Sequence, residues 1–483
     1  MGVSILIAGA GVTGCAVARV LSRYQASVTV VDMAADLAEG ASKANSGIVH
    51  AGFDAHPGTV KAEMNVLGAR MYPALCAELG VPYRQAGALV LGFDEEDRKT
   101  LEGLLEQGKT NGVPGLEILE KDQVLAMEPN TNPEVVCALW APTSGLTSPY
   151  EMTFALADHA ALNGVGFAFD EEVLSVEPRA EGGFRVTTSK GERECDIFIN
   201  CAGVFADKLH NGLCDDKKSI TARRGQYYLF DRTGTIPFNH TMFQCPTKMG
   251  KGVLVTPTVH GNLLLGPSAE DIPDGLDTST TAEGLAFVLD KSRRTWPKAG
   301  MWGTITNFSG IRAHESGGDF VIGAVPGSKG AYEALGIESP GLSAAPAIGE
   351  KLGSQVAQEA GLEIKKEIVP PMKRPKPFHD MSNEERAEAV AKDPDYGKIV
   401  CRCEVVTEAE IREAIRRPVG ARSVDAVKRR TRAGMGRCQG GFCSPRVMEI
   451  LSEEMGVPMI DITKNGGGSY LLTGRIDDTL GKE

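Results

Sequence analysis

Residues 3–14 read VSILIAGAGVTG, and this stretch predicts the fold of the first part of the chain. The apolar run 3–8 is typical of a buried strand, and a helix is expected over 11–23. A second apolar run, SVTVVD (27–32), is expected to be the next strand. Strand, helix and strand in this order indicate a parallel sheet.

The turn between the first strand and the helix has the pattern G-x-G-x-x-G, formed by Gly9, Gly11 and Gly14. Such glycines permit a tight turn and close approach of the backbone to a pyrophosphate, which the helix N-terminus then binds. Asp32 ends the second strand, where an acid accepts a hydrogen bond from a ribose. This favours dinucleotide binding over an ordinary glycine-rich turn, but it does not separate NAD from FAD.

Four cysteines near the end of the chain form two close pairs, Cys401 with Cys403 and Cys438 with Cys443, separated by 34 residues. A [2Fe–2S] cluster takes four thiolates, two on each iron. A structural zinc ion also takes four ligands, but its pairs are usually spaced C-x₂-C. The spacing therefore favours a cluster, with zinc and four unliganded thiols as the alternatives.

The composition is that of an ordinary globular protein of 483 residues, with a net charge of −12. This charge argues against nucleic-acid binding, which requires a basic face. The sequence contains no run of about 18 apolar residues, so no membrane span is predicted. We expect the remaining cysteines to be reduced core thiols of a cytoplasmic protein, whose membrane contact, if any, is peripheral, at the inner face of the cell membrane through partners. These cysteines are residues 15, 76, 137, 195, 201, 214 and 245.

The composition changes at 368–397, where IVPPMKRPKPFHD is followed by charged residues. Prolines stiffen a chain into an extended spacer, so a linker is expected there. Beyond it, residues 408–416 and 444–455 have helical patterns, the second directly after the last cysteine. The glycine-rich NGGGSY (465–470) is expected to be a loop without a chemical role.

Four further stretches resemble segments of the D-amino-acid oxidase (DAO) superfamily of FAD enzymes. They are ASKANSGIVHAG (41–52), DIFINCAGVFADKL (196–209), FSGIRAHESGGDFVIGA (308–324) and GIESPGLSAAPAIGEKL (336–352). Within the superfamily, the anaerobic glycerol-3-phosphate dehydrogenases and the L-2-hydroxyglutarate dehydrogenases or oxidases are the most similar groups. The stretches CRCE (401–404) and KRRTRAGMGRCQGGFC (428–443) resemble bacterioferritin-associated-ferredoxin-like (BFD-like) [2Fe–2S] domains.

The resemblance implies an α/β, Rossmann-like FAD-binding domain with an interleaved α+β substrate domain, mostly an antiparallel sheet, and a small, mainly helical C-terminal [2Fe–2S] domain. The implied FAD-binding segments are 1–80, 140–215 and 305–367, and the substrate-binding segments are 81–139 and 216–304. A linker at 368–397 and the cluster domain at 398–483 follow.

The resemblance also implies site residues. FAD is expected to contact Gly9, Gly11, Gly14, Asp32, Ser42, Asn45, Ser46, Gly47, Val173, Ala202, Gly203, Gly310, Arg312, Gly341, Leu342 and Ser343. His50 is the candidate base or only a hydrogen-bonding group, and His260 is the reserve candidate or a solvated loop residue. Arg312 is expected to bind the anionic group of the substrate, the alternative being a structural salt bridge. Gly341 should begin a helix, with Ser343 as its cap.

Two groups of basic residues have alternative roles. Arg223, Arg224, Lys248 and Lys251 either bind a substrate phosphate beside Arg312 or lie in solvent. Arg429, Arg430, Arg432 and Arg437 offset the charge of the cluster, steer an acidic partner or form a solvated helix face.

The expected activity is that of an FAD-dependent dehydrogenase of a small anionic secondary alcohol, first of all glycerol 3-phosphate, giving dihydroxyacetone phosphate. Hydride would reach the flavin, and electrons would leave through the cluster to electron-accepting protein partners. The alternatives are a 2-hydroxy acid such as L-2-hydroxyglutarate, an amino acid or an opine as the substrate. Another alternative is a cluster that regulates or docks, and a last one is an NAD-dependent enzyme.

Overall fold

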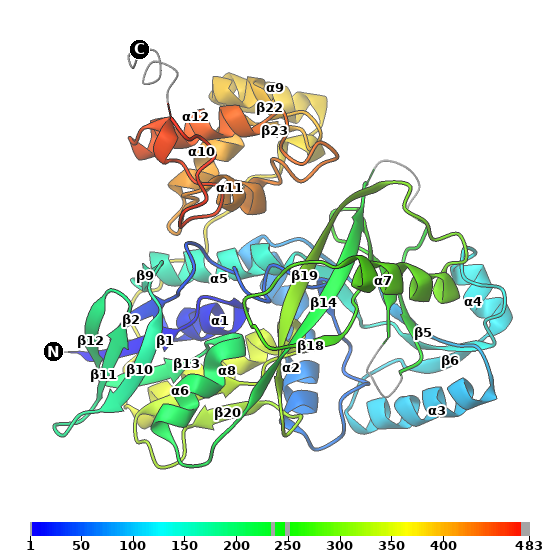
Figure 1. Cartoon of the computed structure of the whole chain (residues 1–483), viewed down its shortest axis with the longest axis horizontal. Helices are drawn as coiled ribbons and strands as arrows, with labels where there is room; N and C mark the ends of the chain where they lie inside the picture. Colours follow the sequence, from blue (N-terminus) through cyan, green and yellow to red (C-terminus); the bar gives the residue numbers. More distant parts are fainter. Residues whose placement is uncertain (1, 233–236, 247–251, 475–483) are drawn as a thin grey trace.

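The predicted parallel sheet is the centre of the first domain (Figure 1). A computed structural model of the chain describes residues 2–232, 237–246 and 252–474. Within these residues, six strands form one sheet in the order β20-β21-β13-β1-β2-β9, parallel except for β20. The strands are β1 (Val3–Ala8), β2 (Ala26–Val31), β9 (Gly166–Ala168), β13 (Ile197–Asn200), β20 (Val321–Ala324) and β21 (Ala331–Leu335).

Alternate residues of β1 pack on opposite faces of this sheet, as the period of two in a strand requires. Ile5 and Ile7 belong to the core shared with four helices. These helices are α1 (Val12–Leu21), α2 (Val60–Leu79), α5 (Pro149–Leu162) and α8 (Gly341–Glu359). Leu6 and Ala8 face a second core. It is shared with α6 (Ala206–Leu213) and the antiparallel strands β10 (Val173–Pro178), β11 (Phe184–Thr188) and β12 (Gly191–Cys195).

A second, mostly antiparallel sheet forms the other large layer. Its order over the described residues is β18-β14-β17-β16-β15-β5-β7-β6, with β19 also paired to β14. The strands are β5 (Ala88–Gly92), β6 (Glu117–Glu120), β7 (Cys137–Ala141), β14 (Ile220–Phe230), β15 (Thr241–Gln244), β16 (Leu254–Pro257), β17 (Leu263–Gly266), β18 (Glu270–Ile272) and β19 (Thr304–Glu315). Helices α3 (Glu95–Thr110) and α7 (Ala282–Thr295) contribute to the cores on its two faces.

Three short strands form a separate small sheet in the order β3-β8-β4. Helix α4 lies at the edge of the second sheet near β6 (Figure 1). The short strands are β3 (Ile48–Val49), β4 (Tyr83–Arg84) and β8 (Gly145–Thr147), and α4 is Lys121–Met127. The sequence-based division places residues 305–315 with the FAD-binding segments. In the structure, β19 pairs along its length with β14, so the strand that carries Arg312 belongs to the second sheet.

The C-terminal part is small and mainly helical. It contains α9 (Asn383–Lys392), α10 (Glu408–Arg416), α11 (Val424–Thr431), α12 (Ser444–Met455) and the short strands β22 (Ile399–Cys401) and β23 (Val406–Thr407). Helix α9 falls within the segment expected to be an extended linker. Ser382 and Glu385 form a capping box there, which starts a helix that the prolines upstream do not prevent.

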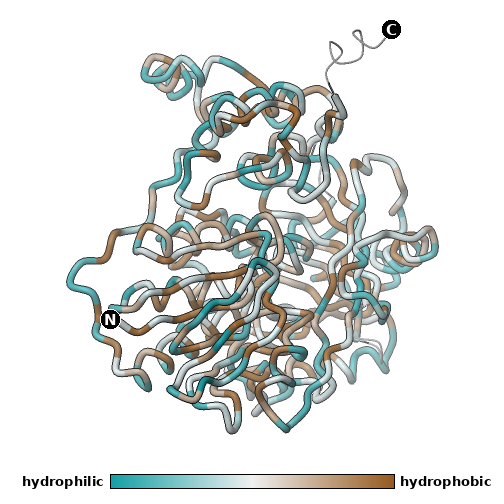
Figure 2. Tube along the Cα trace, turned by 60° about the vertical axis from the view of Figure 1, so that its left-hand side comes forward, coloured by the Kyte–Doolittle hydropathy of each residue, from teal (hydrophilic) through white to brown (hydrophobic). Residues whose placement is uncertain are grey.

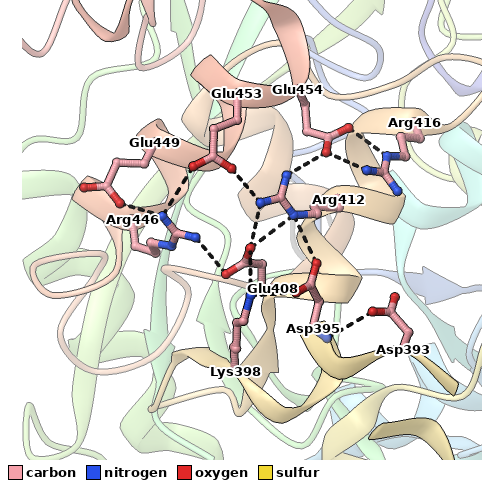
Figure 3. Close-up of polar contacts among 10 residues, drawn as sticks. All are labelled: Asp393, Asp395, Lys398, Glu408, Arg412, Arg416, Arg446, Glu449, Glu453 and Glu454. Carbon is pink, nitrogen blue, oxygen red and sulfur yellow. Dashed lines mark hydrogen bonds and ion pairs between the residues drawn. The ribbon is translucent and has the colours of Figure 1, made fainter. Parts of the chain in front are cut away.

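Ion pairs connect the helices of the C-terminal part (Figure 3). The buried Glu408 accepts from Arg412 of its own helix at 2.7 Å and from Arg446 of α12 at 2.8 Å. Arg412 in turn pairs with Glu453 and Glu454 of α12. Because α10 follows the first cysteine pair and α12 begins after the last cysteine, this network fixes the two pairs relative to each other.

The C-terminal part lies against α5 of the first domain and is shown in orange to red above it in Figure 1. In Figure 2, short apolar stretches alternate with polar ones along the chain of both parts. In the described ranges, no helix is both long and apolar enough to cross a membrane.

Candidate active site and cluster-binding site

A cavity of about 1890 Å³ lies between the two large sheets. Its wall includes the glycine-rich turn after β1, the first residues of α8 and the facing side of β14 and β19. Residues of the C-terminal part, among them Lys428, Met435 and Gln439, complete the wall. The cavity therefore joins both sheets and the cysteine-bearing part.

The turn at 9–14 has no room for a side chain at Gly9 or at Gly14. A Cβ at Gly9, whose φ is +107°, would lie 2.2 Å from the carbonyl oxygen of Cys201, and one at Gly14 would lie 2.0 Å from the carbonyl oxygen of Gly9. Gly11 lines the cavity, and the helix begins at Val12. This cradle fits the pyrophosphate of a dinucleotide.

Asp32, the next residue after β2, lines the same cavity. Its carboxylate accepts from the N–H groups of Ala10 at 2.6 Å and Ala34 at 2.8 Å. Burial raises the pKa of Asp32, and these two hydrogen bonds oppose that shift. Because a carboxylate oxygen can accept more than one hydrogen bond, the position fits a ribose hydroxyl.

The loop 41–47 adopts its shape through its own polar side chains. Ser42 accepts from the N–H of Val12 at 2.9 Å, so it is connected to the start of α1. Asn45 accepts from Gly47 N–H and donates to two carbonyls of the loop, which orders the loop. Ser42, Asn45, Ser46 and Gly47 all line the cavity.

Ala202 and Gly203 line the cavity after the parallel strand β13, and Val173 lines it at the start of the antiparallel strand β10. Gly341 and Leu342 line it at the N-terminus of α8. Ser343 was expected to cap α8, but this expectation is wrong. Pro340 is at the cap position, and Ser343 is fully buried and accepts from the N–H of His50 at 2.8 Å. Ser343 lies inside the first turn of α8. Its hydroxyl therefore connects this helix to His50, directly after β3.

One face of the β14–β19 ladder points into the cavity. Arg223 is opposite Arg312 and Gly225 is opposite Gly310, so their side-chain positions share that face. A Cβ at Gly310 would lie 2.0 Å from the carbonyl oxygen of Ala44. This close approach brings the loop 41–47 directly against β19.

Arg312 lines the cavity, and its guanidinium donates to the carbonyl oxygen of Ser268 at 2.6 Å. Over the described residues, it forms no ion pair with a carboxylate, so the structural salt bridge considered as the alternative is not found there. A guanidinium has five N–H donors. Donors therefore remain for the anionic group of a ligand.

The other basic residues near Arg312 differ from each other. Arg224 is buried and pairs with Glu270 and Asp277, so its charge is already used within the protein. Arg223 lines the cavity but holds Asp271 through two hydrogen bonds, at 2.6 and 3.1 Å. Lys248 and Lys251 lie outside the described residues.

His50 follows β3 and lines the cavity. Its ring is 5.7 Å from that of Phe243, centroid to centroid, at an angle of 34°. With its N–H on Ser343, its backbone is fixed to α8. The position allows either role considered above, base or hydrogen-bonding group.

His260 was expected to be a solvated loop residue if not catalytic, but it is mostly buried and pairs with Glu151 of α5, Nε2 to Oε1 at 2.7 Å. Burial alone would raise the pKa of Glu151, but His260 and Arg374 lower it to about 2. His260 also lines the cavity. It lies two residues before Asn262, which bonds Arg432 of the C-terminal part. His260 is thus at the side of the cavity next to the cysteine-bearing part.

The four cysteines come together as two pairs formed across the sequence gap. The sulfur of Cys403 is 3.7 Å from that of Cys438, and a hydrogen bond from Cys443 lowers the pKa of Cys401 to about 6. Backbone N–H groups of Gly440 and Phe442 also point at the sulfur of Cys438. Two thiolate pairs with N–H donors fit a [2Fe–2S] cluster, whose anionic sulfurs accept such bonds.

No three His, Cys, Asp or Glu side chains of the described residues are placed to hold a single metal ion. The cysteines of this part are arranged as pairs instead. The seven other cysteines are free and buried, as expected.

The arginines before the last two cysteines are not a solvated helix face. Arg430 pairs with Asp36 at 2.7 Å, and Arg429 pairs with Asp36 and Glu39. Arg432 pairs with Glu404 at 2.9 Å. These three are buried, whereas Arg437 is exposed and pairs with Asp231. Arg429 and Arg430 therefore hold the C-terminal part against the loop after β2 and do not steer a partner.

Sequence reasoning missed the residues at this boundary. Asn465, in a loop given no role, accepts from Arg429 and donates to Glu39. Tyr150 donates to the sulfur of Met435 at 3.7 Å. The complementary charges of 36–39 and 429–430 were visible, but nothing in a single sequence pairs segments about 390 residues apart.

Comparison with known protein families gives two matches. A family described as FAD dependent oxidoreductase (DAO) matches residues 4–355. A family described as BFD-like [2Fe-2S] binding domain matches residues 399–453, which contain all four paired cysteines.

Similar proteins cover most of the chain. A glycerol 3-phosphate dehydrogenase of Caloramator mitchellensis is 49% identical over 471 residues, covering 97% of this chain and 98% of that protein. A mitochondrial L-2-hydroxyglutarate dehydrogenase of Arabidopsis thaliana is 28% identical, over 73% of this chain and 83% of that one. The solved structure of an L-alpha-glycerophosphate oxidase from Mycoplasma pneumoniae with FAD bound has a TM-score of 0.73 and 31% identity, and covers 77% of this chain and 99% of that one.

Proposed function

Because this chain belongs to the family of FAD dependent oxidoreductases described as DAO, we propose that it oxidises glycerol 3-phosphate to dihydroxyacetone phosphate and passes the electrons to a protein partner. Its cofactors are FAD and a [2Fe–2S] cluster. The observation that carries the substrate proposal is Arg312, which faces the cavity with donors still available. The name of the relative with 49% identity supports the same substrate.

Arg312 would bind the phosphate of the substrate through charge-assisted hydrogen bonds. Arg223, directly opposite on β14, adds positive charge on the same face, reduced by its pairing with Asp271. These contacts would fix the distance of the secondary alcohol from the cofactor. In this reaction, no bond of the phosphate group is formed or broken.

Oxidation of the alcohol removes a hydride from carbon and a proton from oxygen. Bound FAD supplies the hydride acceptor, and the cluster carries single electrons. A ring nitrogen of His50 would take the hydroxyl proton, since an imidazole titrates near neutral pH. The positive end of the dipole of α8, at Gly341 and Leu342, would stabilise negative charge that develops beside it.

The fused cysteine-bearing part supports a dehydrogenase that passes electrons to another protein. Cys438 adjoins Gln439, which lines the cavity, so the cluster site and the flavin site share one boundary. The location of the protein, and any contact with a membrane through partners, stay predictions.

Anaerobic mixing with candidate substrates tests the proposal. Glycerol 3-phosphate should bleach the flavin absorbance within the time of a turnover, and L-2-hydroxyglutarate, amino acids and opines should not. Bleaching by L-2-hydroxyglutarate and not by glycerol 3-phosphate would replace the proposed substrate with the second candidate, which a carboxylate on Arg312 and the relative from A. thaliana favour.

The relay needs its own test. Cys438→Ser should keep flavin bleaching by substrate but stop reduction of a protein acceptor. Cys245→Ser is the control, because it removes a thiol that lies in a core of the second sheet, far from the four paired cysteines in the sequence. It should change neither flavin bleaching nor reduction of the acceptor. If Cys438→Ser reduces the acceptor normally, the cluster is regulatory or serves docking.

A further inference from the structure

Two large apolar side chains stand far out into solvent. Trp302 is 95% exposed and Phe442 is 89% exposed, and the next most exposed of the described large apolar residues is Ile364 at 66%. Full exposure of an aromatic ring forgoes the stabilisation that its burial would give. Exposed aromatic residues that gather at one place mark interaction sites.

Phe442 belongs to the loop that carries two cysteine ligands. It lies between Cys438 and Cys443, follows Gly440 and Gly441, and directly precedes the ligand Cys443. The ring therefore projects into solvent from a residue whose backbone touches a ligand of the cluster.

Trp302 reaches the same loop through a short series of contacts. The carbonyl oxygen of Gly303 accepts from the N–H of Asp231 at 2.8 Å. The carboxylate of Asp231 pairs with Arg437 at 2.8 Å, and Arg437 directly precedes Cys438. Met301, next to Trp302, is also exposed. Trp302 is thus connected to Arg437, the residue before Cys438, through Gly303 and Asp231.

The charge beside these side chains is positive, although the whole chain carries −12. Arg402 lies between the ligands Cys401 and Cys403 and is exposed. Over residues 2–232, 237–246 and 252–474, it forms no ion pair. Arg437 is also mostly exposed while it pairs with Asp231. The charge therefore complements carboxylates on a partner.

The opposite side of the same loop faces the flavin site. Met435 and Gln439 line the cavity, and Met435 accepts from Tyr150 at 3.7 Å. The segment 435–443 thus has an inner side at the cavity and an outer side in solvent, with the cysteines between them.

From this arrangement we infer that Met301, Trp302, Arg402 and Phe442 form an exit surface, on which an electron-accepting protein docks. The partner would present an apolar patch surrounded by carboxylates, next to its own redox centre. At each encounter one electron passes from the reduced cluster to the oxidised centre of the partner, and no bond or proton moves. The inference rests on the proposed relay and adds where the partner binds and what its surface is like.

The test uses the full chain with both cofactors and oxidised cytochrome b5, a small acidic haem protein, as the probe. The dissociation constant is measured by titration with both proteins oxidised. Trp302→Ser with Phe442→Ser should raise it about tenfold, because exposed aromatic residues dominate such contacts. Arg402→Glu should raise it about fivefold and remove most of its dependence on salt.

Ile364→Ser is the matched control, because it removes the next most exposed apolar side chain at another place, and it should leave the dissociation constant unchanged. The visible spectrum of flavin and cluster should be identical in all variants. Basic cytochrome c should bind the wild type more weakly than cytochrome b5. Equal binding of the two cytochromes, or a double variant within roughly twofold of the wild type, would overturn the inference.

Electron transfer gives a second measurement that does not depend on the substrate. The protein is reduced with dithionite, freed of excess reductant and mixed with cytochrome b5, and reduction of the haem is followed. The double variant should slow this step about tenfold at limiting cytochrome. If glycerol 3-phosphate does not bleach the flavin but these effects are found, the proposed substrate is wrong and the exit surface stands.

Discussion

At the scale of single residues, arginines that look alike in the sequence have different roles in the structure. The match of SGIR to a known segment identified Arg312, and the structure places it at the cavity on a neutral carbonyl. Arg223 and Arg224 are neighbours on one strand, so they point to opposite faces. Arg224 forms ion pairs with two carboxylates that lie 46 and 53 residues further along the chain. No local sequence pattern predicts such long-range pairing.

Arg312→Met tests the residue at the centre of the proposed substrate site. Loss of charge-assisted bonds to an anion costs about 2–4 kcal/mol, so kcat/KM should fall roughly 30- to 1000-fold. Arg185→Met, on β11, the middle strand of the sheet β10-β11-β12, is the control and should behave like the wild type. Steady-state kinetics, with the flavin content of each variant measured in parallel, test whether Arg312 binds the substrate. Unchanged kcat/KM would remove Arg312 from the substrate site.

His159 is a buried histidine held in its neutral form. Its Nδ1 accepts from Arg19 at 3.0 Å, and its Nε2 donates to the carbonyl oxygen of Val369 at 3.0 Å. Burial first, and Arg19 second, lower the pKa of His159 below its ordinary value. An unfolded chain takes up a proton near pH 6.5, and the folded one does so only at lower pH. The stabilisation is therefore present above about pH 6.5 and is lost as the pH falls below it.

This predicts a pH-dependent difference between His159→Gln and the wild type. Glutamine can accept from Arg19 and donate to Val369, but it does not titrate. The midpoint of thermal unfolding should fall less for the variant than for the wild type between pH 7.5 and pH 5.5, about one unit on either side of the ordinary histidine pKa. Parallel curves for the two proteins over this range would show that His159 is not held neutral.

At the scale of elements, local patterns predicted the strand 3–8 and the helices 408–416 and 444–455 well, because apolar periodicity and turns are encoded within each segment. The helix at 383–392 was missed because the prolines upstream outweighed the capping signal of Ser382 and Glu385. The contact of β19 with the loop 41–47 could not be predicted, since it depends on how two distant segments pack. Gly310 marks this contact by having no side chain.

Gly310→Ala tests this contact. The added methyl would lie 2.0 Å from the carbonyl oxygen of Ala44, so either the strand or the loop must move. Overpacking of this kind costs about 1–3 kcal/mol, and the displaced loop lines the FAD cavity. We expect purified Gly310→Ala to retain less FAD, as measured by absorbance. Gly300→Ala meets no close atom and should retain FAD fully; equal FAD content in both would show that β19 does not fix the loop.

At the scale of the whole molecule, one buried group of charges joins the two parts. Asp36 lies between Arg429 and Arg430, and Glu39 extends the group to Asn465. Burial alone would raise the pKa of Asp36, but Arg430 and Arg429 lower it. Its contribution to stability is therefore complete above about pH 4 and is lost only as the pH falls through the lowered pKa.

Asp36→Asn tests how the two parts are held together. It leaves buried arginine charge without its partner, which typically costs about 3–5 kcal/mol. Thermal unfolding should begin at clearly lower temperature, and electron transfer from flavin to cluster should slow while bleaching by substrate continues. Glu106→Gln is the control, because it breaks a solvent-exposed pair with Lys109, and such pairs contribute little to stability. If both variants unfold like the wild type, the buried group does not hold the parts together.

The most direct test of the central claim is rapid freezing of the full protein after anaerobic mixing with glycerol 3-phosphate. Flavin absorbance and the electron paramagnetic resonance signal of a reduced [2Fe–2S] cluster are followed in the same samples. The account predicts that the flavin bleaches and that the cluster signal then appears, whereas Cys438→Ser shows bleaching alone. A flavin that stays oxidised, or a cluster that never becomes reduced while the flavin turns over, would contradict it.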